Sequence, residues 1–560
     1  MKNSLKKYSI LIFLIASFHF SYSQAPNWVW VNSLNINGSI NGMTTDNSGN
    51  SYITGVFYDS VTLGNIKLIS HGGADIFIAK CSSQGDFVWA SEAGSKENDV
   101  SNDICLDDVG NLYICGGYYD TIQFGTYYLY SDKAAENNFV AQYDINSGNC
   151  NYVKQIGTPL NEFNSSNIGT GYLSKIRIDS DGNFYLDGVT DYNLDGLGYI
   201  PVNFGGQVGN GNYIVKYDKN FNLDWVSYVQ PIINNKSIYP LLINDNLGNG
   251  YSIGTLYDTS YCENNLLNTS GISGNSNTYL LKYDNYYGNL DWNKLITGDT
   301  IMSDFASANN GSNIYLTGTY MDTCDFDSLH QYMKEGNTFL AKYDFNGKVI
   351  WTKDFNLNFP GIEMTDDHNG NTALVGNFIG TIKINDSIIF KLGRHIFISL
   401  LDSSGNIQWT RYDTAIGNNY YGFYPSTLAF DNAGNLLIAG NTSSTVILGN
   451  DTLKGIYGEP ISFIAKLGNN ASGVSNLHIN PVSIKLFPNP TSNQLTISSS
   501  SLAISSIQID NILGQQMVSF TQNYIPDQNI FIDVSSLTQG VYIIACYTNR
   551  GIVNTKFVKE

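Results

Sequence analysis

The tryptophans of this chain recur at one position of an internal repeat. A fixed internal period constrains the architecture more strongly than any local motif, because each copy must fold alike and pack on its neighbours. The chain is therefore expected to be a repeat array. Two tryptophans, Trp28 and Trp30, lie near the N-terminus. The other five close a segment of the general form Asp-x-x-Gly-x-x-x-Trp, which the last two match in full and the first three with one change each: Trp89, Trp225, Trp292, Trp351 and Trp409.

A second feature of the repeat is a turn of the form Asp-x-x-Gly-Asn. Asp accepts backbone hydrogen bonds at the start of a turn, and Gly and Asn adopt the left-handed conformation that reverses the chain. The flanking residues alternate between apolar and polar, which is typical of β-strands. Seven such turns occur, two of them in altered form, at residues 46–50, 107–111, 179–183, 245–249, 309–313, 366–371 and 431–435.

The second half of each repeat predicts another hairpin, whose last strand ends at the tryptophan or, in the second repeat, at Tyr152. Four short antiparallel strands repeated seven times are typical of a β-propeller. The expected fold is all-β, with a seven-bladed β-propeller at residues 24–468. The first strand of each second hairpin carries one aromatic residue: Phe77, Phe139, Tyr213, Tyr279, Phe339, Phe397 and Phe463.

The two ends of the array distinguish a closed propeller from an open solenoid. The seventh repeat stops after residues 462–467 without a fourth strand, whereas residues 28–30 match the pattern of residues 87–89. The N-terminal strand is therefore expected to complete the last blade, and residues 24–26 in front of it to be dispensable. The repeated tryptophans are interpreted as packing between blades rather than as ligand platforms, because each buries a large apolar area.

Charge and cysteine content limit the possible partners. The chain has 560 residues, with 29 Lys and Arg against 48 Asp and Glu, a net charge of −19. Such a surface repels nucleic-acid backbones and anionic lipid headgroups, so no nucleic-acid partner is expected. Seven cysteines leave at least one unpaired. The sequence leaves open whether Cys105 and Cys115, which flank one turn, form a disulfide.

The N-terminus has the features of a secretory signal peptide at residues 1–23. Three lysines precede an apolar run at residues 8–20, which is too short and wrongly flanked for a membrane-spanning helix. Cleavage is predicted between Ser23 and Gln24. No later stretch is apolar enough to cross a bilayer, so no transmembrane segment is expected.

The C-terminal part differs in composition from the repeats. A linker of small and polar residues at 469–480 precedes short strands that predict a small immunoglobulin-like β-sandwich at residues 481–560. This part resembles the type A C-terminal sorting domain of the type IX secretion system of Gram-negative bacteria. Four blocks in the family's order carry the resemblance, at residues 486–491, 511–515, 532–542 and 556–559, with the motif residues Pro488, Asn489, Pro490, Gly514, Gly540 and Tyr542.

The resemblance implies passage through the periplasm and export through an outer-membrane translocon, which would be the partner of the sorting domain. The product would be secreted or held on the outer cell surface, with the sorting domain removed. Residues 24–468 are in turn similar to the β-propeller repeats known as SBBP, through the shared Asp-x-x-Gly-Asn-x-Tyr and Phe-x-Ala-Lys-Tyr-Asp patterns. That family implies an extracellular propeller and no particular chemistry.

The sequence offers no motif for catalysis, a cofactor or a metal. It lacks His-Glu-x-x-His, Gly-x-Ser-x-Gly and phosphate-binding loops. The turn at residues 179–183 begins like a calcium loop but lacks its later Gly and Glu. No cofactor and no metal are expected, and no catalytic residue is assigned. A binding or adhesion module is favoured, with a secreted carbohydrate-active enzyme (a glycoside hydrolase or a polysaccharide lyase) as the alternative.

The long connections on one face of the array are the expected ligand-binding region. In an up-and-down blade the tight turns share one face, so the longer connections share the other, and loops on a rigid scaffold often bind ligands. Tyrosine gives amphipathic contact area suited to a glycan or a protein. The candidate residues in these connections, such as residues 118–137 and 411–424, are Tyr118, Tyr119, Tyr127, Tyr128, Tyr130, Tyr420, Tyr421 and Tyr424.

Overall fold

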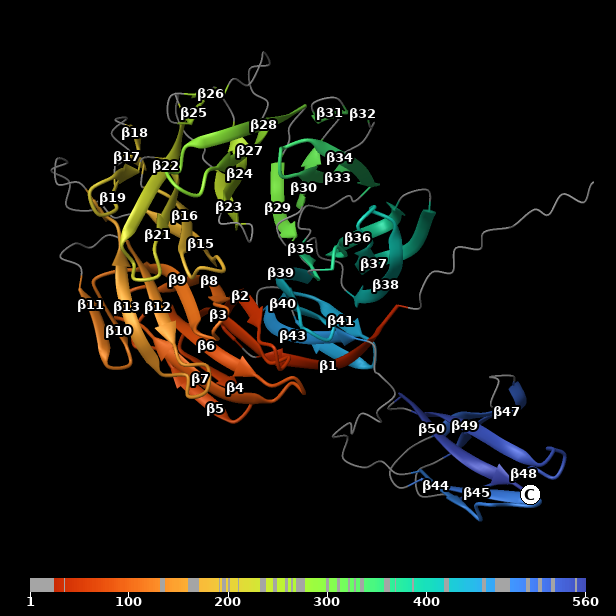
Figure 1. Cartoon of the computed structure of the whole chain (residues 1–560). Coiled ribbons are helices and arrows are strands. Elements are labelled where there is room, and N and C mark those ends of the chain that lie inside the picture. The colour runs from red at the N-terminus through yellow and green to blue at the C-terminus, as the bar shows by residue number, and fades with distance from the viewer. Residues whose placement is uncertain are drawn as a thin grey trace, which may run out of the picture. The chain divides into compact units, whose positions relative to one another are not determined.

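The computed structural model consists of strands and turns, with no helix among the residues that it describes (Figure 1). The chain divides into two compact units, residues 1–470 and residues 471–560. The structure describes residues 25–34, 36–130, 136–159, 171–190, 192–193, 198–199, 202–209, 211–231, 238–244, 249–256, 260–262, 265–267, 277–298, 302–309, 313–320, 323–326, 329–332, 337–356, 363–367, 369–384, 387–416, 423–455, 460–468, 484–499, 504–511, 516–524, 529–548 and 551–560.

The first unit is built from sets of four antiparallel strands, paired in the order of their succession. In the described part of the chain there are seven sets. The first three are β2 (Gly38–Thr45), β3 (Ser51–Phe57), β6 (Asp75–Cys81) and β7 (Phe87–Ala93); β8 (Val100–Leu106), β9 (Leu112–Tyr118), β12 (Asn137–Tyr143) and β13 (Cys150–Ile156); and β15 (Tyr172–Ile178), β16 (Phe184–Val189), β21 (Asn212–Tyr217) and β22 (Leu223–Pro231).

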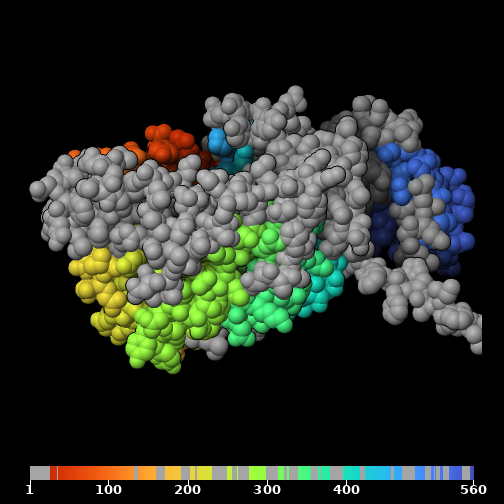
Figure 2. Space-filling view, turned by 90° about the horizontal axis from the view of Figure 1, so that it is seen from above, coloured from red at the N-terminus to blue at the C-terminus, as the bar shows by residue number. Residues whose placement is uncertain are grey.

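The remaining four sets continue the same order. They are β23 (Ile238–Asn244), β24 (Gly250–Leu256), β27 (Asn277–Tyr283) and β28 (Leu290–Gly298); β29 (Met302–Asn309), β30 (Asn313–Tyr320), β33 (Asn337–Asp344) and β34 (Val349–Asn356); β35 (Glu363–Asp366), β36 (Thr372–Ile384), β37 (Ser387–Leu401) and β38 (Ile407–Ile416); and β39 (Phe423–Phe430), β40 (Leu436–Thr442), β43 (Ile461–Gly468) and β1 (Asn27–Leu34). Figure 1 shows the first strands of the sets around a common centre, and Figure 2 shows the yellow, green and teal sets side by side.

A further hairpin, which the sequence did not predict, lies between the second and third strands of a set. In the second set it consists of β10 (Thr121–Phe124) and β11 (Tyr127–Tyr130), so residues 118–137 are not simply a loop. The equivalent hairpins are β4 (Ser60–Leu63) with β5 (Ile66–Ile69), β25 (Ser260–Cys262) with β26 (Asn265–Leu267), β31 (Thr323–Phe326) with β32 (Leu329–Tyr332), and β41 (Thr445–Leu448) with β42 (Asp451–Lys454). The last three of these hairpins each pair with the fourth strand of the preceding set and thereby cover a strand edge that would otherwise be open to aggregation.

The N-terminal strand β1 supplies the fourth strand of the seventh set. It pairs antiparallel with β43, from Trp28 opposite Leu467 to Leu34 opposite Ser462. Figure 1 shows the red β1 beside the blue β43, although the two strands lie at opposite ends of the first unit's sequence. The pairing that the sequence predicts for this strand is confirmed.

The repeated tryptophans connect four of the sets to the set that follows. Trp89 donates its indole N–H to the carbonyl of Ile145, 3.0 Å away in the following set. The Lys80 ammonium donates to the same carbonyl at 3.2 Å, and the Trp89 ring packs on Gly148, which adopts a positive φ. The tryptophans therefore pack between repeats, as predicted. The same bond runs from Trp225 to Asn285, from Trp292 to Phe345 and from Trp351 to Ser403.

The seventh and first sets are joined by the same contact. Trp30 on β1 donates to the carbonyl of Ser83 at 3.1 Å, and Lys466 on β43 donates to it at 3.4 Å. The Trp30 ring lies against Gly85, which again has a positive φ. A strand from the N-terminus therefore takes the place that a consecutive strand takes at the other junctions.

A second series of contacts joins the first strands of neighbouring sets. These strands carry a β-bulge, which turns one polar side chain toward the next set. The side-chain donors and carbonyl acceptors are Asn41 and Ser101, Asn102 and Leu173, and, across the junction of the seventh and first sets, Ser426 and Ile40, at 2.8, 2.8 and 2.6 Å. The tryptophan contacts and the contacts between first strands therefore both run across the junction of the seventh and first sets.

The residues at and in front of β1 also contact the sixth set, through β38. The Arg411 guanidinium donates to the carbonyl of the buried Pro26 at 3.1 Å and lies over the ring of Trp28, 5.6 Å from its centroid. Trp28 in turn donates its indole N–H to Asp413 at 3.1 Å. Residues 24–26 were expected to be dispensable, but removal of Pro26 would leave Arg411 without this acceptor.

The second unit consists of two sheets that share one core. Leu495 and Ile532 from the first sheet pack with Ile507, Ile544 and Phe557 from the second. All seven cysteines are free, and both Cys105 and Cys115 are buried, so the disulfide left open by the sequence is not formed. The sheets are β44 (Ile484–Phe487), β45 (Gln494–Ser499) and β48 (Asn529–Asp533), and β47 (Gln516–Tyr524), β46 (Ile504–Asn511), β49 (Gly540–Thr548) and β50 (Gly551–Lys559).

Replacement of Trp30 tests the junction between the seventh and first sets. Trp30→Ala should lower the free energy of unfolding by about 3 kcal/mol, the lower end for truncating a core tryptophan, because the ring is only partly buried. Denaturant unfolding measures this change. Ser33→Ala, at an exposed position of the same strand, is the control and should change little. Equal stability of the two variants would contradict the junction.

Candidate functional site

The predicted tyrosines form an exposed row on the hairpin of the second set. Tyr127, Tyr128 and Tyr130 on β11 are 39%, 46% and 69% exposed. Tyr128 and Tyr130 point to the same side of the strand, and their rings stack with centroids 6.2 Å apart. Since β11 pairs with β10 through all four of its residues, these rings are presented by a regular hairpin rather than by an irregular loop.

Two further candidates, Tyr118 and Tyr119, come directly before this hairpin in the chain. Tyr118 ends β9 and is fully buried, with its ring 6.5 Å from that of Phe139. It therefore belongs to the core, and its assignment as a surface binding residue is wrong. Tyr119 is partly buried, and its hydroxyl lies 3.3 Å from a Glu136 carboxylate oxygen. All residues of β9 are buried and Tyr119 is the first residue after this strand, so the two neighbours differ because the sheet ends between them.

The remaining candidates do not join the hairpin. Tyr424 is 42% exposed, but it lies on β39 in the seventh set, which the whole first set separates from the second. Tyr420 and Tyr421 lie outside the described residues. The structure thus groups Tyr128 and Tyr130 into one surface, whereas Tyr127 points to the other side of the same strand.

Two buried carboxyl groups lie beside Tyr119. Asp99 accepts the Tyr119 N–H at 3.3 Å, and Asp75 accepts the His71 N–H at 2.5 Å. One oxygen of each carboxyl group is buried and has no partner among the described residues. Burial raises the pKa of Asp99 to about 7, with a further contribution from Asp75, and it also raises the pKa of Asp75. Because both carboxyls are fully buried, they are closed to a substrate in this structure.

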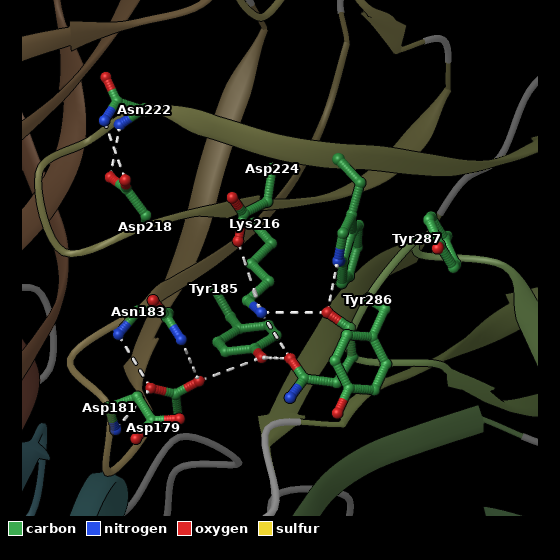
Figure 3. Close-up of polar contacts among 12 residues, drawn as sticks. Asp179, Asp181, Asn183, Tyr185, Lys216, Asp218, Asn222, Asp224, Tyr286 and Tyr287 are labelled. Atoms are coloured by element: carbon green, nitrogen blue, oxygen red, sulfur yellow. Dashed lines mark hydrogen bonds and ion pairs between the residues drawn. The ribbon is translucent and has the colours of Figure 1, made fainter.

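A second pair of exposed aromatic residues lies on a tight turn of the fourth set. Tyr286 and Tyr287 are 81% and 78% exposed, and their rings make none of the contacts drawn in Figure 3. The neighbouring Asn285 accepts hydrogen bonds from Trp225 and from Lys216 through its carbonyl. Sequence reasoning missed this pair because it searched only the long connections.

The acidic turns use their carboxylates within the turn. Asp179 accepts the N–H groups of Asp181 and Asn183 at 3.0 and 2.8 Å, and also the hydroxyl of Tyr185 at 3.2 Å. Asp218 binds Asn222 in the same way (Figure 3). Within the described residues, no group of three or more His, Cys, Asp or Glu side chains is arranged to hold a metal ion.

The motif residues of the C-terminal unit hold its strands together. Asn489, in the bend between Pro488 and Pro490, accepts the N–H of Val558 at 2.9 Å and donates to the carbonyl of Lys556 at 3.2 Å. The first sequence block is thereby tied to the last.

The third sequence block packs on the last one as well. Tyr542 is buried two residues after Gly540, the first residue of β49. Its ring stacks on Phe557 with centroids 5.6 Å apart, and its hydroxyl donates to the carbonyl of Thr538 at 2.8 Å. Gly514 and the cleavage residues Ser23 and Gln24 lie outside the described residues.

Residues 485–560 match the family of secretion system C-terminal sorting domains. No curated protein matches the chain. The chain is similar in structure to quinohemoprotein alcohol dehydrogenase from Comamonas testosteroni (9% identity, 84% of this chain and 80% of that one, TM-score 0.39). It is also similar to the Dos1 propeller (11%, 83% and 93%, 0.34) and to BamB from Moraxella catarrhalis (10%, 95% and 99%, 0.30). Likeness at this level carries no implication for activity.

The sorting domain assigns the chain to export by type IX secretion, with a secreted or cell-surface location. The machinery of that system is accordingly the partner that recognises the C-terminal segment. The described residues contain no apolar helix of membrane-spanning length.

The buried carboxyl of Asp99 predicts a pH dependence of stability. Its pKa is raised in the folded state, so folding favours the protonated form, and stability falls as the pH rises from about 4 to about 7. Asp99→Asn should remove this contribution, so that its melting temperature falls less between pH 5 and pH 8 than that of the unmodified protein. Asp108→Asn, at an exposed turn position, is the control. Parallel melting curves for all three proteins would rule out this role of Asp99.

Proposed function

We propose that the chain is an exported binding module, a closed seven-bladed β-propeller that engages a glycan or a protein outside the cell. Its parts are a signal peptide at residues 1–23, the propeller at 24–468, a linker at 469–480 and an immunoglobulin-like sorting domain at 481–560. The seven four-stranded sets and the repeated tryptophan contacts support the propeller. The two sheets with one shared core support the sandwich.

The exposed row of tyrosines on β11 carries the proposal of binding. Three large side chains on this hairpin are 39% to 69% exposed, so packing in the core does not explain their presence. Tyrosine loses little conformational entropy on binding, because it has few rotatable bonds. It also combines an apolar ring with a hydroxyl. Presentation by paired strands fixes the spacing of the rings, which lowers the entropic cost of binding.

A secreted carbohydrate-active enzyme is the second candidate. The observation that favours it is the raised pKa of Asp99, at about 7, beside the carboxyl of Asp75. A proton donor in glycoside hydrolysis has a raised pKa of this kind and works with a second carboxylate. Against this role, both groups are buried, so a substrate would require the hairpin region to open.

Removal of two stacked rings tests the binding surface. In a screen of the mature protein against a glycan panel and extracellular matrix proteins, Tyr128→Ala with Tyr130→Ala should lose most of the binding, because the stacked pair supplies the contact area. Tyr58→Ala removes an equally exposed ring (43%) from the first set and should bind normally.

Two results would contradict the proposal. Unchanged binding by the double variant would place the ligand elsewhere. Hydrolysis of chromogenic glycosides by the unmodified protein, lost in Asp99→Asn, would establish the enzyme instead.

A further inference from the structure

The turn at residues 284–289 presents two tyrosines that the repeat does not need. Tyr286 and Tyr287 are more exposed than any other aromatic side chain for which the structure describes an exposed fraction, at 81% and 78%. The other repeats serve as internal controls for this position, because their turns form the same hydrogen bonds. In those turns the corresponding exposed residues are small or polar: Gln84, Asn146 and Ser147, Asn220, Asn346 and Ser404.

The turn holds both tyrosines rigidly. One carboxylate oxygen of Asp284 accepts the N–H groups of Tyr286 and Tyr287 at 2.9 and 2.7 Å. Asn285, which lies between Asp284 and Tyr286 in the chain, accepts the indole N–H of Trp225 at its carbonyl, 3.1 Å away. Because the turn backbone is already fixed by these hydrogen bonds, no loop has to become ordered when a partner binds. This lowers the entropic cost of contact with a partner.

In the ion pairs around this turn, the acidic side chains are more exposed than the basic ones. Asp224 forms an ion pair with Lys216, and Asp291 forms one with Lys282. The carboxylate side chains are 36% and 48% exposed, whereas their lysine partners are only 6% and 15% exposed. Figure 3 shows Lys216 between Asp224 and the turn that carries Tyr286. A partner approaching this surface therefore meets carboxylates and aromatic rings, in a chain whose net charge is −19.

We propose that Tyr286 and Tyr287 form a docking site for a basic segment of a partner protein. Lys or Arg side chains bind over the faces of the rings, where the ring quadrupole attracts a cation, and Asp224 and Asp291 complement their charge. This site lies on the face of the tight turns, opposite the connections that carry β11. It is therefore independent of the tyrosine row assigned to the ligand above.

The test compares variants that leave the net charge unchanged. The mature protein is titrated with octalysine at about 0.15 M salt, where long-range attraction is screened, and binding is followed by calorimetry. Tyr286→Ala with Tyr287→Ala should weaken binding by about 5- to 30-fold, the loss expected for two cation–π contacts. Asn146→Ala with Ser147→Ala changes the same turn of the second repeat and should bind as the unmodified protein does.

Three outcomes overturn the proposal. The first is absence of binding by the unmodified protein. The second is equal affinity of both double variants, which would assign octalysine binding to bulk charge. The third is binding of cellohexaose, rather than octalysine, that depends on the two tyrosines, which would make the turn a sugar platform. None of these results concerns Tyr128 or Tyr130, so the function proposed for β11 stands or fails separately.

Discussion

In the described part of the first unit, a single backbone carbonyl organises five of the seven junctions between sets. It is the carbonyl of Ile145 between the first two sets and that of Ser83 between the last set and the first. A tryptophan indole and, at several junctions, a lysine ammonium converge on it, as Lys466 does on Ser83. Buried donors without acceptors are costly, so at these junctions one set orients the next. The same constraint explains the glycine of the turn, because a Cβ on Gly85 or Gly148 would strike the indole.

Much of this architecture was predictable from the sequence because it is periodic. The tryptophans and the Asp-to-Gly turns repeat often enough to define the four-stranded set, and the incomplete seventh set indicated the role of β1. The hairpins between the second and third strands were missed because their signal is short. Gly64, Gly125 and Gly449 share a positive φ of about 60° at the tips of three of them, and each follows two alternating apolar residues, a pattern that was available in the sequence.

The binding surface was predictable only in part. Composition and loop length identified the region of β11, but they could not separate Tyr118 from Tyr128, because the choice between core and surface depends on where β9 ends. Tyr286 and Tyr287 were missed because tight turns were assumed to be structural. Comparing this turn with its five counterparts would have found them, since only the fourth repeat places two large rings there. The burial of Asp75 and Asp99 depends on contacts distant in sequence and had no local signal.

The two ends of the first unit's sequence form one sheet, and we propose that this pairing closes the array. Hydrogen exchange of the backbone amides tests it most directly, because a protected amide reports a strand that opens only with its sheet. We expect the amides within residues 30–34 of β1 that bond to β43 to exchange as slowly as residues 462–466 of β43, to which they are paired. Rapid exchange throughout β1 beside a protected β43 would contradict closure by the N-terminal strand.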